Sequence, residues 1–148
     1  MLKKRRKQAI FIVVMVLLLL GIGCIKSNMP NQKIKLFGFS IWIIDSGSML
    51  PTLKIGDAII IKEQPEYEKG DMITYQVDEF YYVTHRIIEK TNEGYVTKGD
   101  FNNIEDKGRV LPETIEGKVV FHSTILGYIV QYSWILIILL FLMIILMI

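Results

Sequence analysis

Met-Ile-Thr-Tyr-Gln-Val at residues 72–77 and Tyr-Tyr-Val-Thr-His-Arg-Ile-Ile-Glu at residues 81–89 decide the fold class of this 148-residue chain. Both runs are rich in β-branched and aromatic residues, which favour extended strands. The step Val77-Asp78-Glu79 begins the break between them and is typical of a turn. The two runs therefore predict successive short strands of a β domain.

Four further runs of similar composition flank this pair. They lie at residues 41–44, 58–62, 95–98 and 115–121. Polar steps that contain glycine separate the runs, at residues 56–57, 69–71, 92–94 and 99–100. Residues 101–112 lack apolar alternation and are predicted to form a loop. Regularly spaced short strands predict a mainly β fold, a small sandwich or barrel.

Apolar blocks lie on both sides of the β region. Residues 9–25 hold no charge, and as a helix they would span about 25 Å, short but adequate for a bilayer core of about 30 Å. Residues 125–148 form the second block. The predicted organisation is a cytoplasmic basic segment at 1–8, a transmembrane helix at 9–25, an extracytoplasmic β domain at 26–123 and a transmembrane helix at 124–148.

Charge indicates the orientation of the first block. Lys3, Lys4, Arg5, Arg6 and Lys7 precede it, and such a cluster keeps the N-terminus in the cytoplasm. The same pattern is found in cleavable secretory signals, and a lipoprotein signal around the lone cysteine of the chain is a further alternative. We favour an uncleaved anchor because no clear small-x-small cleavage site follows the block. For the second block, the alternative is a tail buried against the β domain.

Composition excludes several classes of function. The net charge is only +2 and its basic excess lies at the N-terminus, whereas a nucleic-acid binder carries basic charge within its folded domain. Cys24 is the single cysteine, so the sequence has neither a disulfide framework nor a thiolate metal site. We therefore expect no nucleic-acid partner, no metal and no cofactor.

A serine turn follows directly after the run at residues 41–44. It reads Ser46-Gly47-Ser48-Met49-Leu50-Pro51. A nucleophilic serine needs a rigid turn whose backbone N–H groups can face a developing oxyanion, and Gly47 permits a tight backbone there. Pro51 fixes the chain beyond it. By itself this pattern favours a plain structural turn over a catalytic one.

Four segments in order resemble the sequence boxes of the type I signal peptidases. They are Ser46-Gly47-Ser48-Met49-Leu50-Pro51-Thr52-Leu53, then Gly56-Asp57 with residues 58–61, then Tyr82-Val83-Thr84-His85-Arg86-Ile87-Ile88, and finally Thr97-Lys98-Gly99-Asp100-Phe101-Asn102-Asn103 with Asp106. The resemblance implies Ser48 as nucleophile, with Ser46 and the Ser48 backbone N–H as oxyanion hole. It also implies supporting roles for Gly47, Met49, Pro51, Gly99 and Asp100.

Histidine at position 85 indicates the branch of the family. Most bacterial members have a lysine base there, whereas endoplasmic-reticulum, archaeal and sporulation-type members have histidine, so His85 is implied to be the general base. Asp106 resembles the triad aspartate of this branch, and we expect Asp100 to hold the loop; the reverse assignment stays open. Asp45 is a third acidic candidate, and His122 is interpreted as structural.

The resemblance implies a membrane-bound serine endopeptidase that cleaves exported preproteins at small-x-small sites. The substrate would bind extended beside residues 41–44 and 81–84. Its expected partners are signal-peptide-bearing preproteins, the lipid bilayer and the secretion translocon. One rival hypothesis is a Ser–Lys peptidase of the repressor-cleaving kind, which the predicted anchors and His85 disfavour. Another is a non-catalytic surface β domain, which the presence of both Ser48 and His85 disfavours.

Overall fold

The computed structural model describes residues 11–12, 35 and 37–146. The predicted segment at 1–8 lies outside the described residues, as does the span at 9–25 apart from Phe11 and Ile12. The chain divides into two compact units, and the unit Lys33–Gln131 contains all six strands.

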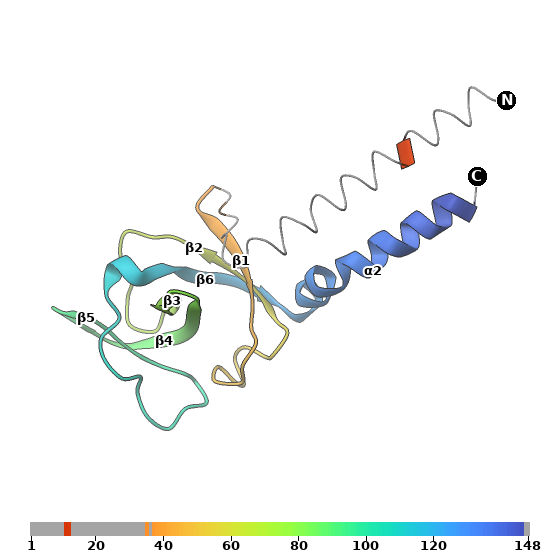
Figure 1. The fold of residues 1–148 in the computed structure, drawn as a ribbon. Helices are drawn as coiled ribbons and strands as arrows, with labels where there is room; N and C mark the ends of the chain where they lie inside the picture. The colour runs from red at the N-terminus through yellow and green to blue at the C-terminus, as the bar shows by residue number, and fades with distance from the viewer. Residues whose placement is uncertain (1–10, 13–34, 36, 147–148) are drawn as a thin grey trace. The chain divides into compact units, whose positions relative to one another are not determined.

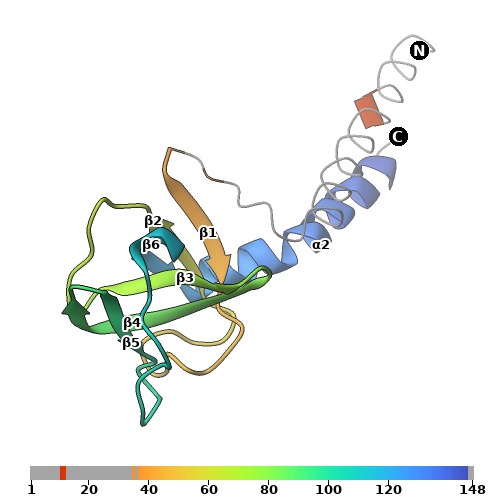
Figure 2. The same cartoon turned by 60° about the vertical axis from the view of Figure 1, so that its left-hand side comes forward.

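The strands form one antiparallel sheet. In chain order they are β1 (Phe39–Ile43), β2 (Ala58–Lys62), β3 (Met72–Asp78), β4 (Tyr81–Thr91), β5 (Gly94–Lys98) and β6 (Ile115–Ser123), with a 3₁₀ turn at Pro112–Thr114. Their order in the sheet is β1-β2-β6-β3-β4-β5 (Figures 1 and 2). The predicted mainly β class is therefore confirmed, although the six strands belong to one sheet rather than to two stacked sheets.

Two clusters of buried side chains lie on opposite faces of β3. Ile73 and Tyr75 point into the first cluster, whereas Met72, which alternates with them, packs against the second. The first cluster contains Tyr67, Ile73, Tyr75, Ile87, Tyr95, Val110 and Ile115. The second contains Ile44, Met49, Leu53, Ile59, Ile61 and Val119. Because Met49 and Leu53 follow Ser48, the second cluster anchors the serine turn.

Two strand edges of the described sheet lie close to one another. β1 is at one end of that sheet, and residues 81–85 of β4 pair with β3, whereas the pairing of β4 with β5 begins at Arg86. Trp42 of β1 and Tyr82 of β4 stack at a tilt, with ring centroids 4.8 Å apart. The two edges predicted to receive a substrate strand therefore flank one another in the described domain.

Helix α2 (Thr124–Leu146) follows β6 without a connecting loop. Its first two turns belong to the unit that contains the sheet. Within the residues that the structure describes, no helix is both long enough and apolar enough to cross a membrane. The transmembrane segments at 9–25 and 124–148 remain predictions from the sequence.

Candidate active site

Ser46 and Ser48 lie on the loop of residues 44–57 that joins β1 to β2, which we call the serine loop. The backbone of Ile44 closes this loop at its base, since Ile44 N donates to Asp57 O at 2.9 Å and Gly56 N donates to Ile44 O at 2.8 Å. Met49 and Leu53 are 1% and 0% exposed, and their burial fixes the loop on the sheet. Each contributes about 1.5–3 kcal/mol by leaving water.

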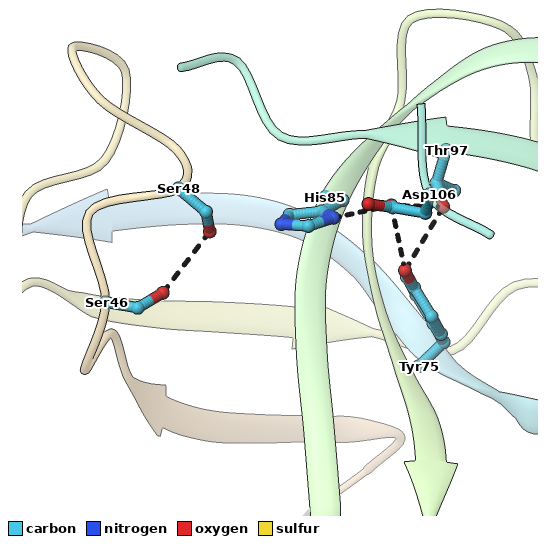
Figure 3. Close-up of polar contacts among 6 residues, drawn as sticks. All are labelled: Ser46, Ser48, Tyr75, His85, Thr97 and Asp106. Atoms are coloured by element: carbon cyan, nitrogen blue, oxygen red, sulfur yellow. Dashed lines mark hydrogen bonds and ion pairs between the residues drawn. The ribbon is translucent and has the colours of Figure 1, made fainter. Parts of the chain in front are cut away.

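The two serine hydroxyls point toward each other above this anchored base. Their Oγ atoms are 3.2 Å apart, and either can be the donor (Figure 3). Ser46 is exposed and Ser48 is half-buried, so a reagent can approach from the open side of the loop.

His85 and Asp106 form the closest polar pair of the site. His85 lies on β4 with its side chain 9% exposed, and its Nδ1 is 2.6 Å from Asp106 Oδ2. Figure 3 shows that the other ring nitrogen is on the side of the imidazole toward Ser48. Since ionised carboxylates only accept hydrogen bonds, Nδ1 carries a proton whenever Asp106 is charged, which leaves Nε2 of a neutral ring free to accept one.

Three further hydrogen bonds hold Asp106, two at its carboxylate and one at its backbone. Its Oδ2 accepts from Thr97 Oγ1 at 2.7 Å and from Tyr75 OH at 3.1 Å (Figure 3), and its backbone N donates to Thr97 O at 2.8 Å. Burial raises the pKa of the Tyr75 hydroxyl, so Tyr75 stays protonated and remains a donor. The orientation of the carboxylate is therefore set before any ligand binds.

Asp100 lies in a different network. Arg86 binds it through two parallel hydrogen bonds, Nε to Oδ1 at 2.8 Å and Nη2 to Oδ2 at 2.7 Å, and Thr52 Oγ1 donates to Oδ2 at 2.5 Å. The Arg86 guanidinium holds the pKa of this carboxyl below its usual range. Thr52 belongs to the serine loop and Arg86 to β4, so Asp100 joins the loop to the strand that carries His85.

Gly99 completes this junction. A Cβ at position 99 would lie 2.5 Å from the carbonyl oxygen of Ser48, and Phe101 N donates to that same oxygen at 2.9 Å. A side chain would therefore push the turn at 99–100 away from the serine. The turn contacts the backbone of Ser48 and not the imidazole of His85.

The remaining acidic and imidazole candidates lie elsewhere. Asp45 is exposed on the serine loop. His122 lies on β6, where its Nδ1 is 4.0 Å from the carboxylate of Asp57. Among the described residues, neither forms a hydrogen bond or an ion pair with His85 or Asp106.

The sequence did not single out several residues that the site uses. Thr97 and Tyr75 bind Asp106, and Arg86 and Thr52 bind Asp100. Arg86 stands directly after His85 and alternates to the opposite face of β4, which could have indicated a separate partner. Tyr75 carries no such local signal, because its contact arises from the pairing of β3 with β4.

An open groove reaches His85 and Asp106 on the side of β3 and β4. Its volume is about 490 Å³, and it is lined in addition by Tyr81, Val83 and Lys107, among others. Within the described part of the chain, no group of three or more His, Cys, Asp or Glu side chains is gathered to hold a metal ion.

Comparison with known proteins gave two curated relatives, and no family model matches the chain. Signal peptidase I W of Bacillus subtilis (strain 168) is 32% identical over 114 residues, which is 72% of this chain and 60% of that protein. The signal peptidase complex catalytic subunit SEC11 of Plasmodium falciparum (isolate 3D7) is 35% identical over 72 residues, 45% of this chain and 39% of that protein. The chain thus spans less than two thirds of the length of each relative.

Proposed function

We propose, from its relationship to the type I signal peptidases of the endoplasmic-reticulum and archaeal branch, that this chain is a serine endopeptidase that removes signal peptides from exported preproteins. The observation that carries the proposal is the imidazole of His85, which is held by Asp106 at 2.6 Å and has its other nitrogen on the side of Ser48. A hydroxyl, an imidazole and a carboxylate in this order can perform acyl transfer.

In the proposed mechanism, Ser48 Oγ attacks the scissile carbonyl carbon while His85 Nε2 takes the hydroxyl proton. The resulting oxyanion is held by the Ser48 backbone N–H and the Ser46 hydroxyl, whose oxygen is 3.2 Å from Ser48 Oγ. His85 then gives its proton to the leaving amine, and a water molecule, deprotonated by the same nitrogen, releases the acyl group from Ser48. Asp106 stabilises the imidazolium in both halves of the reaction.

Before attack, the Ser48 hydroxyl must turn from Ser46 toward His85. We expect the side chain to rotate on substrate binding, because catalytic hydrogen bonds commonly tighten only when substrate is bound. The deeper part of the site needs no such change, because Thr97 and Tyr75 already hold Asp106.

The open edges of β1 and β4 support an extended substrate. A peptide between them would add a strand beside β1, which ends the described sheet, and beside the part of β4 that pairs with β3. The Trp42–Tyr82 pair joins these two strands, and its bulk would leave room only for small side chains of a peptide bound beside it, which agrees with a small-x-small cleavage site.

For the location of the enzyme, we propose a cell-membrane protein with two spanning segments, at 9–25 and 124–148, a cytoplasmic N-terminus and an extracytoplasmic catalytic domain. The support is the apolar sequence of both blocks and the five cations before the first. Preproteins, the bilayer and the secretion translocon are the proposed partners.

Reaction with a fluorophosphonate, which modifies only an activated serine, tests the function directly. The full-length protein should label at Ser48, and Ser48→Ala should abolish both labelling and cleavage of a signal-bearing precursor. Ser46→Ala should still label at Ser48, but more slowly, because it removes a donor and not the nucleophile. Labelling that persists in Ser48→Ala would refute the assignment.

A further inference from the structure

A buried carboxylate that the proposed mechanism does not use lies at the end of the serine loop. Asp57 is 2% exposed. Its Oδ2 accepts from the backbone N of Lys54 at 2.9 Å, and its Oδ1 accepts from Thr124 Oγ1 at 2.6 Å. Since burial of an unpaired charge is costly, both contacts are needed to keep this carboxylate in place. One oxygen thus holds the loop, and the other holds the first residue of helix α2.

The second turn of α2 touches the same part of the loop. Gly127 is buried, and a Cβ added there would overlap the carbonyl oxygen of Gly56. Gln131 Nε2 lies 3.4 Å from that oxygen. Only a glycine at position 127 permits the helix to approach the loop backbone so closely.

These contacts meet where the backbone of the loop closes. Gly56 N and Asp57 O make the two hydrogen bonds to Ile44, which stands four residues before Ser48. The start of the helix is itself fixed, because Ser123 Oγ accepts from Leu126 N at 3.2 Å. The base of the serine loop and the first two turns of α2 are therefore joined by side-chain and backbone contacts.

We propose that the first two turns of α2 position the nucleophile: through Asp57 and Gly56, Thr124 and Gly127 hold the serine loop where Ser48 meets His85. The inference rests on the proposed catalytic role of Ser48, and it assigns Asp57, Thr124 and Gly127 as positioning residues that touch no substrate. A shift of the helix start would move the loop relative to β4 and leave the pairing of β1 with β2 and of β4 with β3 unchanged.

This arrangement predicts a specific kinetic effect. Loosening of the helix start lowers kcat, because Ser48 leaves its attack position, and leaves KM nearly unchanged. A residue that acted only on stability would lower the folded fraction and leave the kcat of the folded molecules intact.

The experiment compares Thr124→Val with Thr124→Ser in the full-length protein. Valine removes the hydroxyl that donates to Asp57, whereas serine keeps it. Hydrogen exchange of residues 44–57 should become about tenfold faster in Thr124→Val and should stay near the wild-type rate in Thr124→Ser, given the usual worth of a hydrogen bond to a charged group. Fluorophosphonate labelling and kcat on an Ala-x-Ala precursor peptide should fall in the valine variant and recover in the serine variant.

Gly127→Ala gives an independent test. Alanine favours a helix more than glycine does, so a loss of loop protection in this variant reports the overlap with Gly56 and not a weaker helix. Ile125→Ala is the matched control, because Ile125 is on the same turns of α2 and is 73% exposed. We expect Gly127→Ala to resemble Thr124→Val and Ile125→Ala to resemble the wild type.

The outcomes separate this inference from the proposed function. Wild-type exchange at residues 44–57 in both Thr124→Val and Gly127→Ala would overturn the positioning role, as would a uniform rise of exchange across β3 to β5. If exchange becomes faster only in the loop of these variants, while the wild-type protein does not react with the fluorophosphonate, the coupling of helix and loop is upheld and the proposed peptidase function is rejected.

Discussion

Replacement of Asp106 by asparagine is the sharpest test of the proposed mechanism. The change keeps the size of the side chain and removes its charge. In the structure Asp106 Oδ2 receives three donors, His85 Nδ1 at 2.6 Å, Thr97 Oγ1 at 2.7 Å and Tyr75 OH at 3.1 Å. An amide can present either its oxygen or its NH₂ group at that point, so the variant keeps the fold and loses the carboxylate.

The expected size of the effect follows from the charge that develops on His85. Two opposite unit charges about 4 Å apart attract by about 4 kcal/mol at an effective dielectric constant of about 20. Loss of this attraction in the transition state slows the reaction by about 10³-fold. If the amide NH₂ group faces Nδ1, the imidazole also adopts the wrong tautomer, and the loss approaches about 10⁴-fold.

The assay is cleavage of a signal-bearing precursor by the purified full-length protein, with the melting temperature measured on the same sample. Asp45→Asn is the matched control, since Asp45 is an exposed aspartate on the serine loop. We expect Asp106→Asn to be folded and nearly inactive and Asp45→Asn to be active. A folded Asp106→Asn variant within about tenfold of the wild-type rate would refute the role of the carboxylate in this mechanism.

Four further perturbations have expected outcomes. Asp100→Asn should lower the melting temperature more than the activity of the folded fraction. Because Arg86 lowers the pKa of Asp100, the stability from this pair is present above about pH 4 and is lost as the pH falls below it, so circular dichroism melts of the variant should change less between pH 5 and 3 than those of the wild type. His85→Lys should not label with a fluorophosphonate at neutral pH, since a lysine there would need strong desolvation to lose its proton; labelling at the wild-type rate would contradict this. Leu53→Ala should cost about 2–5 kcal/mol in urea unfolding, because Leu53 is fully buried, and a cost below about 0.5 kcal/mol, as for a surface change, would show that the cluster does not anchor the loop. A protease added outside cells should digest residues 26–123, and protection of that region would overturn the proposed topology.

The sequence predicted the six strands well because each one is a local pattern. The runs at 72–77 and 81–89 correspond to β3 and β4. The loop at 101–112 was confirmed except at Val110, which forms an isolated β-bridge with Tyr95, and at Pro112, which begins the 3₁₀ turn. The order of the sheet could not be predicted, because β6 inserts between β2 and β3 and that pairing joins residues far apart in the chain. Local pattern carries no signal for such contacts.

In the candidate site too, the sequence predicted the residues that lie in local motifs and missed the contacts between residues far apart in the chain. The resemblance of four sequence segments predicted Ser48, His85 and Asp106 as site residues, and the structure brings His85 and Asp106 together. Asp57 was interpreted as a turn residue, yet it is buried and holds the start of α2. Its partner Thr124 lies 67 positions along the chain, so only the folded arrangement reveals the contact.

The open edge of β1 also affects how the protein behaves at high concentration. Ile41 is 56% exposed on this strand, and an edge strand with apolar side chains can pair with the same strand of another copy. In such an edge-to-edge dimer, the second copy would occupy the position proposed for the substrate, and the dimer would be inactive. Activity per molecule should therefore fall as the purified protein is concentrated, and an extended peptide inhibitor should keep the enzyme monomeric.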